Sequence, residues 1–224
     1  MKQVLAGLLI FIGLCQLTLA APIDPLAELG QAELKELKLA KMIFKTQKVA
    51  DSPWPRLKIF QQLEGRPLQA IGIFSAYEYQ TEYIPNLILS KVIKVISAVE
   101  VHTQYEMKMP WPLPNGRYVN GHKLEKLGPN SFRLNWYLVR SNSASETTGS
   151  ASFYPLGDKT VMVYSSYIRP KSFLAPLFRG FFYKDTKASI NSIAGYIKKT
   201  LGDPKKTTKL LGLAKSALAG KSPY

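Results

Sequence analysis

Histidine and cysteine, the side chains most often used as nucleophiles, acid–base groups and transition-metal ligands, are scarce in this chain. Its 224 residues include two histidines, His102 and His122, and one cysteine, Cys15. A zinc site would therefore need mostly carboxylate ligands, which is unusual. Because His102 falls on the polar face of a predicted strand and His122 stands beside Lys123, we expect both imidazoles at the surface. We expect no metal and no other cofactor.

Paired carboxylates are a second source of acid–base chemistry. Glu78 and Glu82 have helical spacing but lie among Tyr and Gln residues, as on a solvated helix face. Glu100 and Glu106 fall on the same polar strand face as His102. The sequence also lacks a Gly-x-Ser-x-Gly elbow, a P-loop and a dinucleotide-binding fingerprint. These patterns contain no catalytic constellation, and we expect the protein not to be an enzyme.

Large aromatic side chains are more informative, because ligand pockets are mostly apolar with a few polar groups that fix orientation. Five aromatic residues fall on positions of predicted strands or helices that face inward. Each alone fits ordinary core packing, but together they predict an aromatic-lined pocket, in which the tyrosine hydroxyls need hydrogen-bonding partners. The predicted ligand-binding residues are Tyr105, Trp136, Tyr164, Phe178 and Phe182.

The N-terminus has the layout of a secretory signal peptide. Residues 1–3 are basic, residues 4–15 form an unbroken apolar run, and small residues at Thr18 and Ala20 precede a cleavage point. The run is shorter than the about 20 residues of a membrane-spanning helix, although an uncleaved anchor is the alternative. We expect residues 1–20 to be removed and the mature protein, which then has no cysteine, to be exported to the periplasm or secreted.

Hydrophobic periodicity divides the rest of the chain into helices, then strands, then a long helix. Residues 99–109 alternate apolar and polar side chains, and residues 178–201 carry an apolar stripe along a helix. Strands separated by short turns pair antiparallel, since parallel neighbours need long crossovers. The class is therefore α+β, with a turn at 51–55. We expect helices at 27–39, 67–76, 78–83 and 178–201, and strands at 42–49, 56–63, 87–96, 99–109, 118–124, 132–139, 148–154 and 160–168.

Three stretches, in this order, resemble the START-like superfamily. Residues 83–92 resemble the family's segment that leads from its second short helix into the strand meander. Residues 105–113 resemble its strand that ends in a Pro-aromatic-Pro turn, and residues 149–164 resemble its next two strands. The resemblance covers residues 42–201. It implies the helix-grip fold, in which a curved antiparallel sheet wraps around a long C-terminal helix and encloses a hydrophobic cavity.

The resemblance also implies a function. Relatives include START lipid-transfer domains, coenzyme Q-binding proteins and polyketide cyclases, so we expect a protein that binds, or transfers, a hydrophobic ligand such as a lipid or isoprenoid quinone. The alternative is a polyketide cyclase or aromatase type enzyme using the same cavity, with Arg117 and Tyr164 as candidate groups. Many relatives carry an Arg-Asp pair where Gly116 and Arg117 stand here, and an acid near the position of Ala76. Functions that rest on those charged groups are not carried over.

The net charge is strongly positive, because 30 basic side chains face 15 acidic ones to give +15. No nucleic-acid-binding motif accompanies this charge, so we expect no nucleic-acid partner. Residues 202–224 carry five lysines among leucines and alanines. They form either a basic amphipathic helix that binds anionic membrane surfaces, or a tail that is disordered or packed on the core. We expect a monomer with a helical lead-in at 21–41, a START-like ligand-binding domain at 42–201 and this tail.

Overall fold

The computed structural model describes residues 24–224, and the predicted signal peptide at residues 1–20 lies outside them. The predicted strands and helices are all present with small shifts of their ends, and two further helices appear, a short one directly before the long helix and one after it. The strands are β1 (Ile43–Gln47), β2 (Arg56–Leu63), β3 (Leu87–Ser97), β4 (Glu100–Met107), β5 (Gly116–Gly128), β6 (Ser131–Ser141), β7 (Ala144–Leu156) and β8 (Lys159–Pro170). The helices are α1 (Gln31–Lys38), α2 (Pro67–Phe74), η1 (Tyr77–Glu82), η2 (Ala175–Phe178), α3 (Arg179–Leu201) and α4 (Pro204–Leu218).

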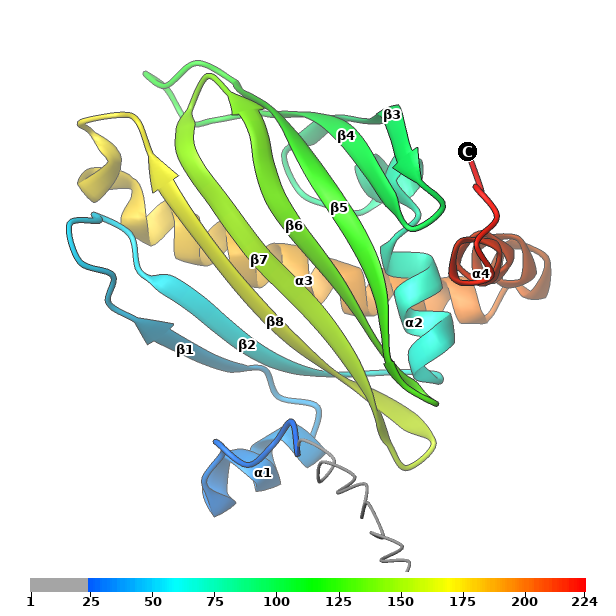
Figure 1. The fold of residues 1–224 in the computed structure, drawn as a ribbon. Helices are drawn as coiled ribbons and strands as arrows, with labels where there is room; N and C mark the ends of the chain where they lie inside the picture. The colour runs from blue at the N-terminus through cyan, green and yellow to red at the C-terminus, as the bar shows by residue number, and fades with distance from the viewer. Residues whose placement is uncertain (1–23) are drawn as a thin grey trace, which may run out of the picture.

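The eight strands form one antiparallel sheet in the order β1-β2-β8-β7-β6-β5-β4-β3. Strands β3 to β8 follow one another as a meander, and β2 then pairs with β8, so early and late parts of the chain lie side by side. Helix α3 crosses one face of the sheet, and α2 and α4 stand near its C-terminal end (Figure 1). The predicted α+β class, a curved antiparallel sheet around a long C-terminal helix, is confirmed.

Side-chain alternation determines which strand residues face α3. On β4, Val101 and Tyr105 are buried and the residues beside them are less so, as predicted for a half-buried strand. On α3, Ile190, Ile193 and Ile197 are buried in the same core as Val101. Each such aliphatic side chain contributes about 1.5–3 kcal/mol on burial, so the predicted helix stripe is what attaches α3 to the sheet.

Gly149 on β7 allows an aromatic side chain to lie close against the sheet. It pairs with Trp136 of β6, and a Cβ at position 149 would clash with the Trp136 indole and the Ser165 carbonyl oxygen. The Trp136 ring also packs against Tyr164 of β8, with ring centroids 5.2 Å apart. Glycine at this position therefore allows the Trp136 ring to pack directly on the sheet beside Tyr164.

Residues 204–218 form helix α4, which differs from a disordered tail. The Asp203 carboxylate caps the helix by accepting a hydrogen bond from the Lys206 backbone nitrogen at 3.0 Å. Leu210 and Ala214 are buried, and Gly72 of α2 lies against the α4 backbone. The apolar face of the segment is thus covered by protein, and its lysines are what reach solvent. The amphipathic pattern could not separate these outcomes, because a core-packed helix and a membrane-surface helix share it.

Helix α1 covers the opposite face of the sheet near β1 and β2. Leu37 of α1 packs with Phe60 and Val161, whereas the neighbouring strand residues Ile59 and Met162 belong to the main core beneath α3. This division follows from the two-residue period of a strand. Within residues 24–224, every helix is too short or too polar to cross a lipid bilayer.

Candidate ligand-binding cavity

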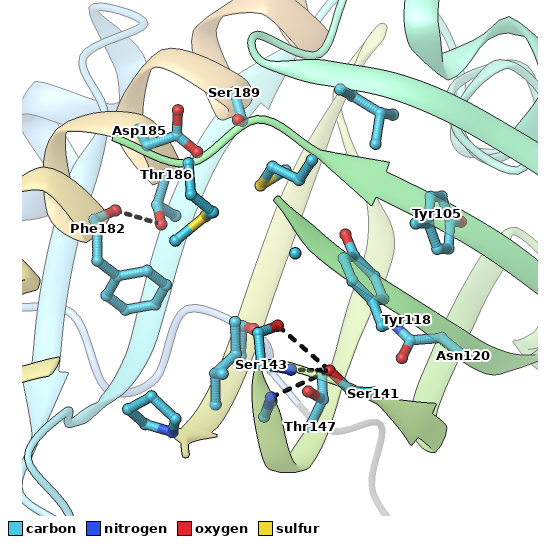
Figure 2. A pocket seen from close by; sticks show the side chains of 18 of the residues that line it. Tyr105, Tyr118, Asn120, Ser141, Ser143, Thr147, Phe182, Asp185, Thr186 and Ser189 are labelled. Atoms are coloured by element: carbon cyan, nitrogen blue, oxygen red, sulfur yellow. Dashed lines mark hydrogen bonds between the residues drawn. The ribbon is translucent and has the colours of Figure 1, made fainter. Parts of the chain in front are cut away.

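A cavity of about 490 Å³ lies between the sheet and α3. Small-molecule pockets usually measure about 300–1,000 Å³, so this space suits a ligand. Most of its lining side chains are aromatic or aliphatic. About a third of the lining residues are polar. Among them, Asp185 and Ser189 project from α3 toward the strands that carry Tyr105 and Tyr118 (Figure 2). The arrangement is that of a mainly apolar pocket with polar groups on both walls.

All five aromatic residues predicted to bind a ligand line this cavity. Trp136 and Tyr164 stand on the sheet wall, whereas Phe178 and Phe182 stand at the start of the helical wall. Phe182 stacks on Trp54, with ring centroids 4.4 Å apart and an interplanar angle of 11°. That these side chains contact a ligand stays a prediction.

The inner end of the cavity, beside α2 and η1, holds a buried histidine. His122 is 6% exposed, its Nε2 lies 3.1 Å from the Tyr105 hydroxyl oxygen, and the Tyr77 ring packs 4.7 Å from the imidazole centroid. Burial lowers the pKa of His122 to about 3, and the charge of His102 is a smaller cause. The imidazole is therefore neutral at neutral pH.

The surface position expected for His122 is wrong, and strand geometry gives the reason. Neighbouring residues of a strand point to opposite faces, so the exposed Lys123 implies an inward-pointing His122. By the same alternation Tyr118, Asn120 and His122 all face inward and line the cavity. The charged residues Arg117 and Lys123 lie an even number of positions apart, so they share one strand face, and this was the signal that would have placed His122 on the other face.

The helical wall carries a carboxyl group. The Asn86 side-chain amide donates a hydrogen bond to the Asp185 carboxylate at 2.7 Å. Burial raises the pKa of Asp185, and the hydrogen bond from Asn86 opposes that shift. The next residue, Thr186, donates a hydrogen bond from its hydroxyl to the Phe182 carbonyl oxygen at 2.8 Å (Figure 2). The Tyr118 phenol points into the space in front of this wall.

Two loops border the mouth of the cavity, residues 108–115 after β4 and residues 171–178 after β8. Both contribute lining residues. Both also expose large apolar side chains to solvent: Trp111 is 91% exposed, Phe173 89% and Leu177 79%. Each of the two loops that border the mouth therefore holds large apolar side chains in solvent.

The two groups considered for cyclase chemistry lie apart. Tyr164 lines the cavity, whereas Arg117 is exposed and pairs with Glu106 at 3.2 Å. Arg117 points outward because its neighbour Tyr118 points inward. Arg117 is thus not a cavity residue, and the expectation that it acts there is wrong. Within residues 24–224, no cluster of three or more His, Cys, Asp or Glu side chains is placed to hold a metal ion.

Trp54 is a cavity residue that the sequence did not indicate. It belongs to the predicted turn at 51–55, yet it is 7% exposed and its indole nitrogen donates to the Ala175 carbonyl oxygen at 2.8 Å. With Phe182 it closes the cavity between β2 and the start of α3. The two prolines around Trp54 indicate a turn, but no local pattern reveals a partner 121 residues away.

No family model matches this chain, and no curated protein matches its sequence. Solved structures do match its fold. A STAR-related lipid transfer protein from Xanthomonas axonopodis gives a TM-score of 0.64 at 14% identity, over 70% of this chain and 93% of that one. Human StAR-related lipid transfer protein 5 gives 0.60 at 10% identity, over 75% and 93%. The Zhui aromatase/cyclase from Streptomyces sp. R1128 gives 0.54 at 6% identity, over 65% and 94%.

These structures include lipid transfer proteins and an aromatase/cyclase, so the likeness identifies a fold and leaves the reaction open. Low sequence identity accompanies a match over most of each chain. Together with the sheet order, the long helix and the cavity between them, it confirms the resemblance that residues 42–201 carry. The fold of this chain is the helix-grip fold of the START-like superfamily.

Proposed function

We propose that this protein binds one hydrophobic ligand between the sheet and α3, as a monomer, and exchanges it at a membrane surface. The observation that carries the proposal is the cavity of about 490 Å³ with mainly apolar walls. START-like neighbours that include lipid transfer proteins support it. A lipid or an isoprenoid quinone suits this wall chemistry, because burial of apolar surface is the dominant favourable term available there.

Three titratable groups of the cavity, the Tyr105 and Tyr164 phenols and the His122 imidazole, favour binding over acid–base catalysis. The Asp185 carboxyl, whose pKa burial raises, is the exception. Burial raises the pKa of the Tyr105 and Tyr164 phenols and lowers that of His122 to about 3. All three groups are neutral at neutral pH, whereas a general acid or base works best with a pKa near the working pH. Cyclase-type catalysis is the alternative, and loss of turnover in a folded Tyr164→Phe variant would favour it.

The mouth of the cavity supports exchange at a membrane. Exposed Lys108 adjoins the Trp111 loop, and exposed Lys171 and Arg179 flank the loop that carries Phe173. Aromatic side chains favour the membrane interface, and each nearby Lys or Arg adds about 1 kcal/mol on anionic lipid. Since the apolar face of α4 is packed inside the protein, we assign the membrane contact to the mouth and only longer-range attraction to the α4 lysines.

We further propose that the protein acts outside the cytoplasm, in the periplasm or as a secreted protein. The support is the basic start and apolar run of residues 1–15, followed by small residues before Ala21. Intact-mass analysis of protein from an exporting host is expected to give a chain that begins at Ala21. Retention of residues 1–20 would contradict cleavage.

Filling the cavity tests the proposed function. Ser189 projects from α3 into the cavity (Figure 2), whereas Asn191 on the same helix is exposed. Ser189→Trp places an indole in the ligand space, and Asn191→Trp places the same group at the surface as the matched control. In a fluorescence titration with the apolar dye Nile red, we expect Ser189→Trp to weaken binding about ten-fold, equivalent to about 1.4 kcal/mol. Asn191→Trp is expected to bind like the wild type.

Equal affinity of the wild type and a folded Ser189→Trp variant would show that the dye binds outside the cavity. A wild-type protein that binds neither Nile red nor any member of a lipid panel would remove the proposed function. Circular dichroism of both variants confirms that each has folded before the affinities are compared.

A further inference from the structure

The inner end of the cavity carries two polar atoms without partners. Asn120 and His122 stand two residues apart on β5, so their side chains share the inward face. Both residues line the cavity and each is 6% exposed. Among the residues that the structure describes, neither Asn120 Oδ1 nor His122 Nδ1 has a hydrogen-bond partner. Buried polar atoms are normally paired. Both atoms are wholly buried in the unliganded protein, so a ligand group completes their hydrogen bonding once the Asn120 and His122 side chains turn toward the cavity.

The hydrogen bond with the Tyr105 hydroxyl determines which nitrogen of the His122 imidazole carries the proton. Its oxygen lies 3.1 Å from His122 Nε2, and a neutral imidazole carries one proton, on either nitrogen. The phenol is the more acidic donor of the two, and the imidazole nitrogen is the more basic acceptor. Tyr105 therefore donates to Nε2, which leaves the imidazole proton on Nδ1. The inner end thus has a donor, His122 Nδ1–H, on the same strand face as an acceptor, Asn120 Oδ1.

We propose that Asn120 and His122 bind a ligand hydroxyl group, so that the ligand is an apolar alcohol that enters the cavity hydroxyl first. A hydroxyl oxygen accepts one hydrogen bond from His122 Nδ1–H and donates one to Asn120 Oδ1. This inference rests on the proposed function, because it names the polar group of the same hydrophobic ligand.

The charges of the cavity walls argue against a charged head group at this end. The charged lining residues are Asp185 on α3 and Lys171 after β8. Lys171 donates to the Ser141 carbonyl oxygen at 2.8 Å, at the end of β6. Tyr77, Tyr105 and the neutral His122 surround the inner end instead. A carboxylate or ammonium group would lose its hydration there without an opposite charge.

Three probes that share the same twelve-carbon chain test the hydroxyl directly, through displacement of Nile red by 1-dodecanol, its methyl ether 1-methoxydodecane, and dodecane. The ether accepts from His122 but donates nothing to Asn120. We expect the wild type to bind 1-dodecanol about ten-fold more tightly than the ether, since the ether leaves Asn120 Oδ1 unpaired.

Two cavity variants separate the two hydrogen bonds. Asn120→Leu keeps the approximate shape of the side chain. It is expected to bring the ratio of the affinity for the alcohol to the affinity for the ether close to one. His122→Phe is expected to weaken the alcohol and the ether equally, relative to dodecane. Thr147→Val, another lining residue near the mouth, is the control and should keep the wild-type ratio.

The outcomes distinguish this inference from the proposed function. A wild-type ratio near one, or a preference that persists in folded Asn120→Leu protein, overturns the hydroxyl site and leaves the proposed function intact. Failure of the wild type to bind Nile red or any of the three probes contradicts the proposed function instead. If the variants do not fold, the wild-type ratio still decides, together with ¹⁵N NMR of His122. A proton on Nε2 in place of Nδ1 would overturn the assignment.

Discussion

The two ends of the cavity are built in opposite ways. At the inner end, Tyr77, Tyr105 and His122 pack together as buried neutral groups with raised or lowered pKa values. At the mouth, Trp111 and Phe173 are about nine-tenths exposed. Buried groups contribute to stability through packing and desolvation, whereas exposed side chains contribute little. The inner end therefore contributes to stability, and under the proposed function it also recognises the ligand, whereas the mouth is left free for the proposed exchange.

The largest expected effect comes from crowding the sheet wall. Gly149→Ala forces the Trp136 indole away from the sheet, because the new Cβ meets the ring and the Ser165 carbonyl oxygen. We expect a loss of about 3 kcal/mol in the free energy of unfolding, the upper end of the overpacking range. Gly128→Ala is the matched control, since nothing lies within 4 Å of a Cβ there. Equal urea-unfolding midpoints for the two variants would contradict the tight wall.

A pH-dependent effect follows from the inner end. The pKa of His122 in the folded chain, about 3, lies below its unfolded value of about 6.5. Between those values the unfolded chain binds a proton that the folded chain does not, so stability falls as the pH falls. From about pH 7 to about pH 5 we expect the wild type to lose about 2 kcal/mol more than His122→Phe, measured by urea unfolding. If the free energy of unfolding of the wild type and of His122→Phe changed in parallel with pH, the lowered pKa of His122 would be contradicted.

At the mouth the expected effect is on membrane binding and not on stability. Replacing Trp111 and Phe173 by serine removes the exposed apolar groups, and we expect binding to phosphatidylcholine–phosphatidylglycerol vesicles to weaken about ten-fold. The free energy of unfolding is expected to stay within about 0.5 kcal/mol. Leu127→Ser, at an exposed position near the end of β5, is the control. Unchanged cosedimentation of the double variant would place the membrane contact elsewhere.

The smallest effect is expected from the lysines of α4. Lys205→Gln with Lys215→Gln removes two exposed charges while the buried face of the helix stays intact. Because attraction at a distance is screened, we expect vesicle binding to weaken only about two-fold and the difference to vanish at high salt. A loss larger than that caused by the mouth variant would assign the membrane contact to α4.

Local periodicity predicted most of the fold, since strand and helix periods are properties of neighbouring residues. Alternation in residues 99–109 placed Tyr105 inside, and the stripe along residues 178–201 placed Phe182 against the sheet. The wall residues could be chosen in this way because each lies on the apolar side of its element. The resemblance to the START-like superfamily supplied what periodicity lacks, the arrangement of the elements around a cavity.

Contacts between distant segments could not be predicted in the same way. The Trp54 indole meets Ala175 across 121 residues, and the apolar face of α4 meets α2 through Gly72, so neither partner shows in the local pattern. His122 is a different case. The charge of Lys123 suggested a solvated strand, although alternation would have turned the imidazole inward.

Native mass spectrometry of the gently purified protein, from an exporting host, tests most directly whether the cavity holds one hydrophobic ligand. We predict one apolar molecule per chain on the wild type and on Asn191→Trp, and its loss from Ser189→Trp, whose indole occupies the space between sheet and α3. A wild-type protein that carries no such molecule and takes up none from a lipid panel would contradict the central claim, as would an undiminished adduct on folded Ser189→Trp.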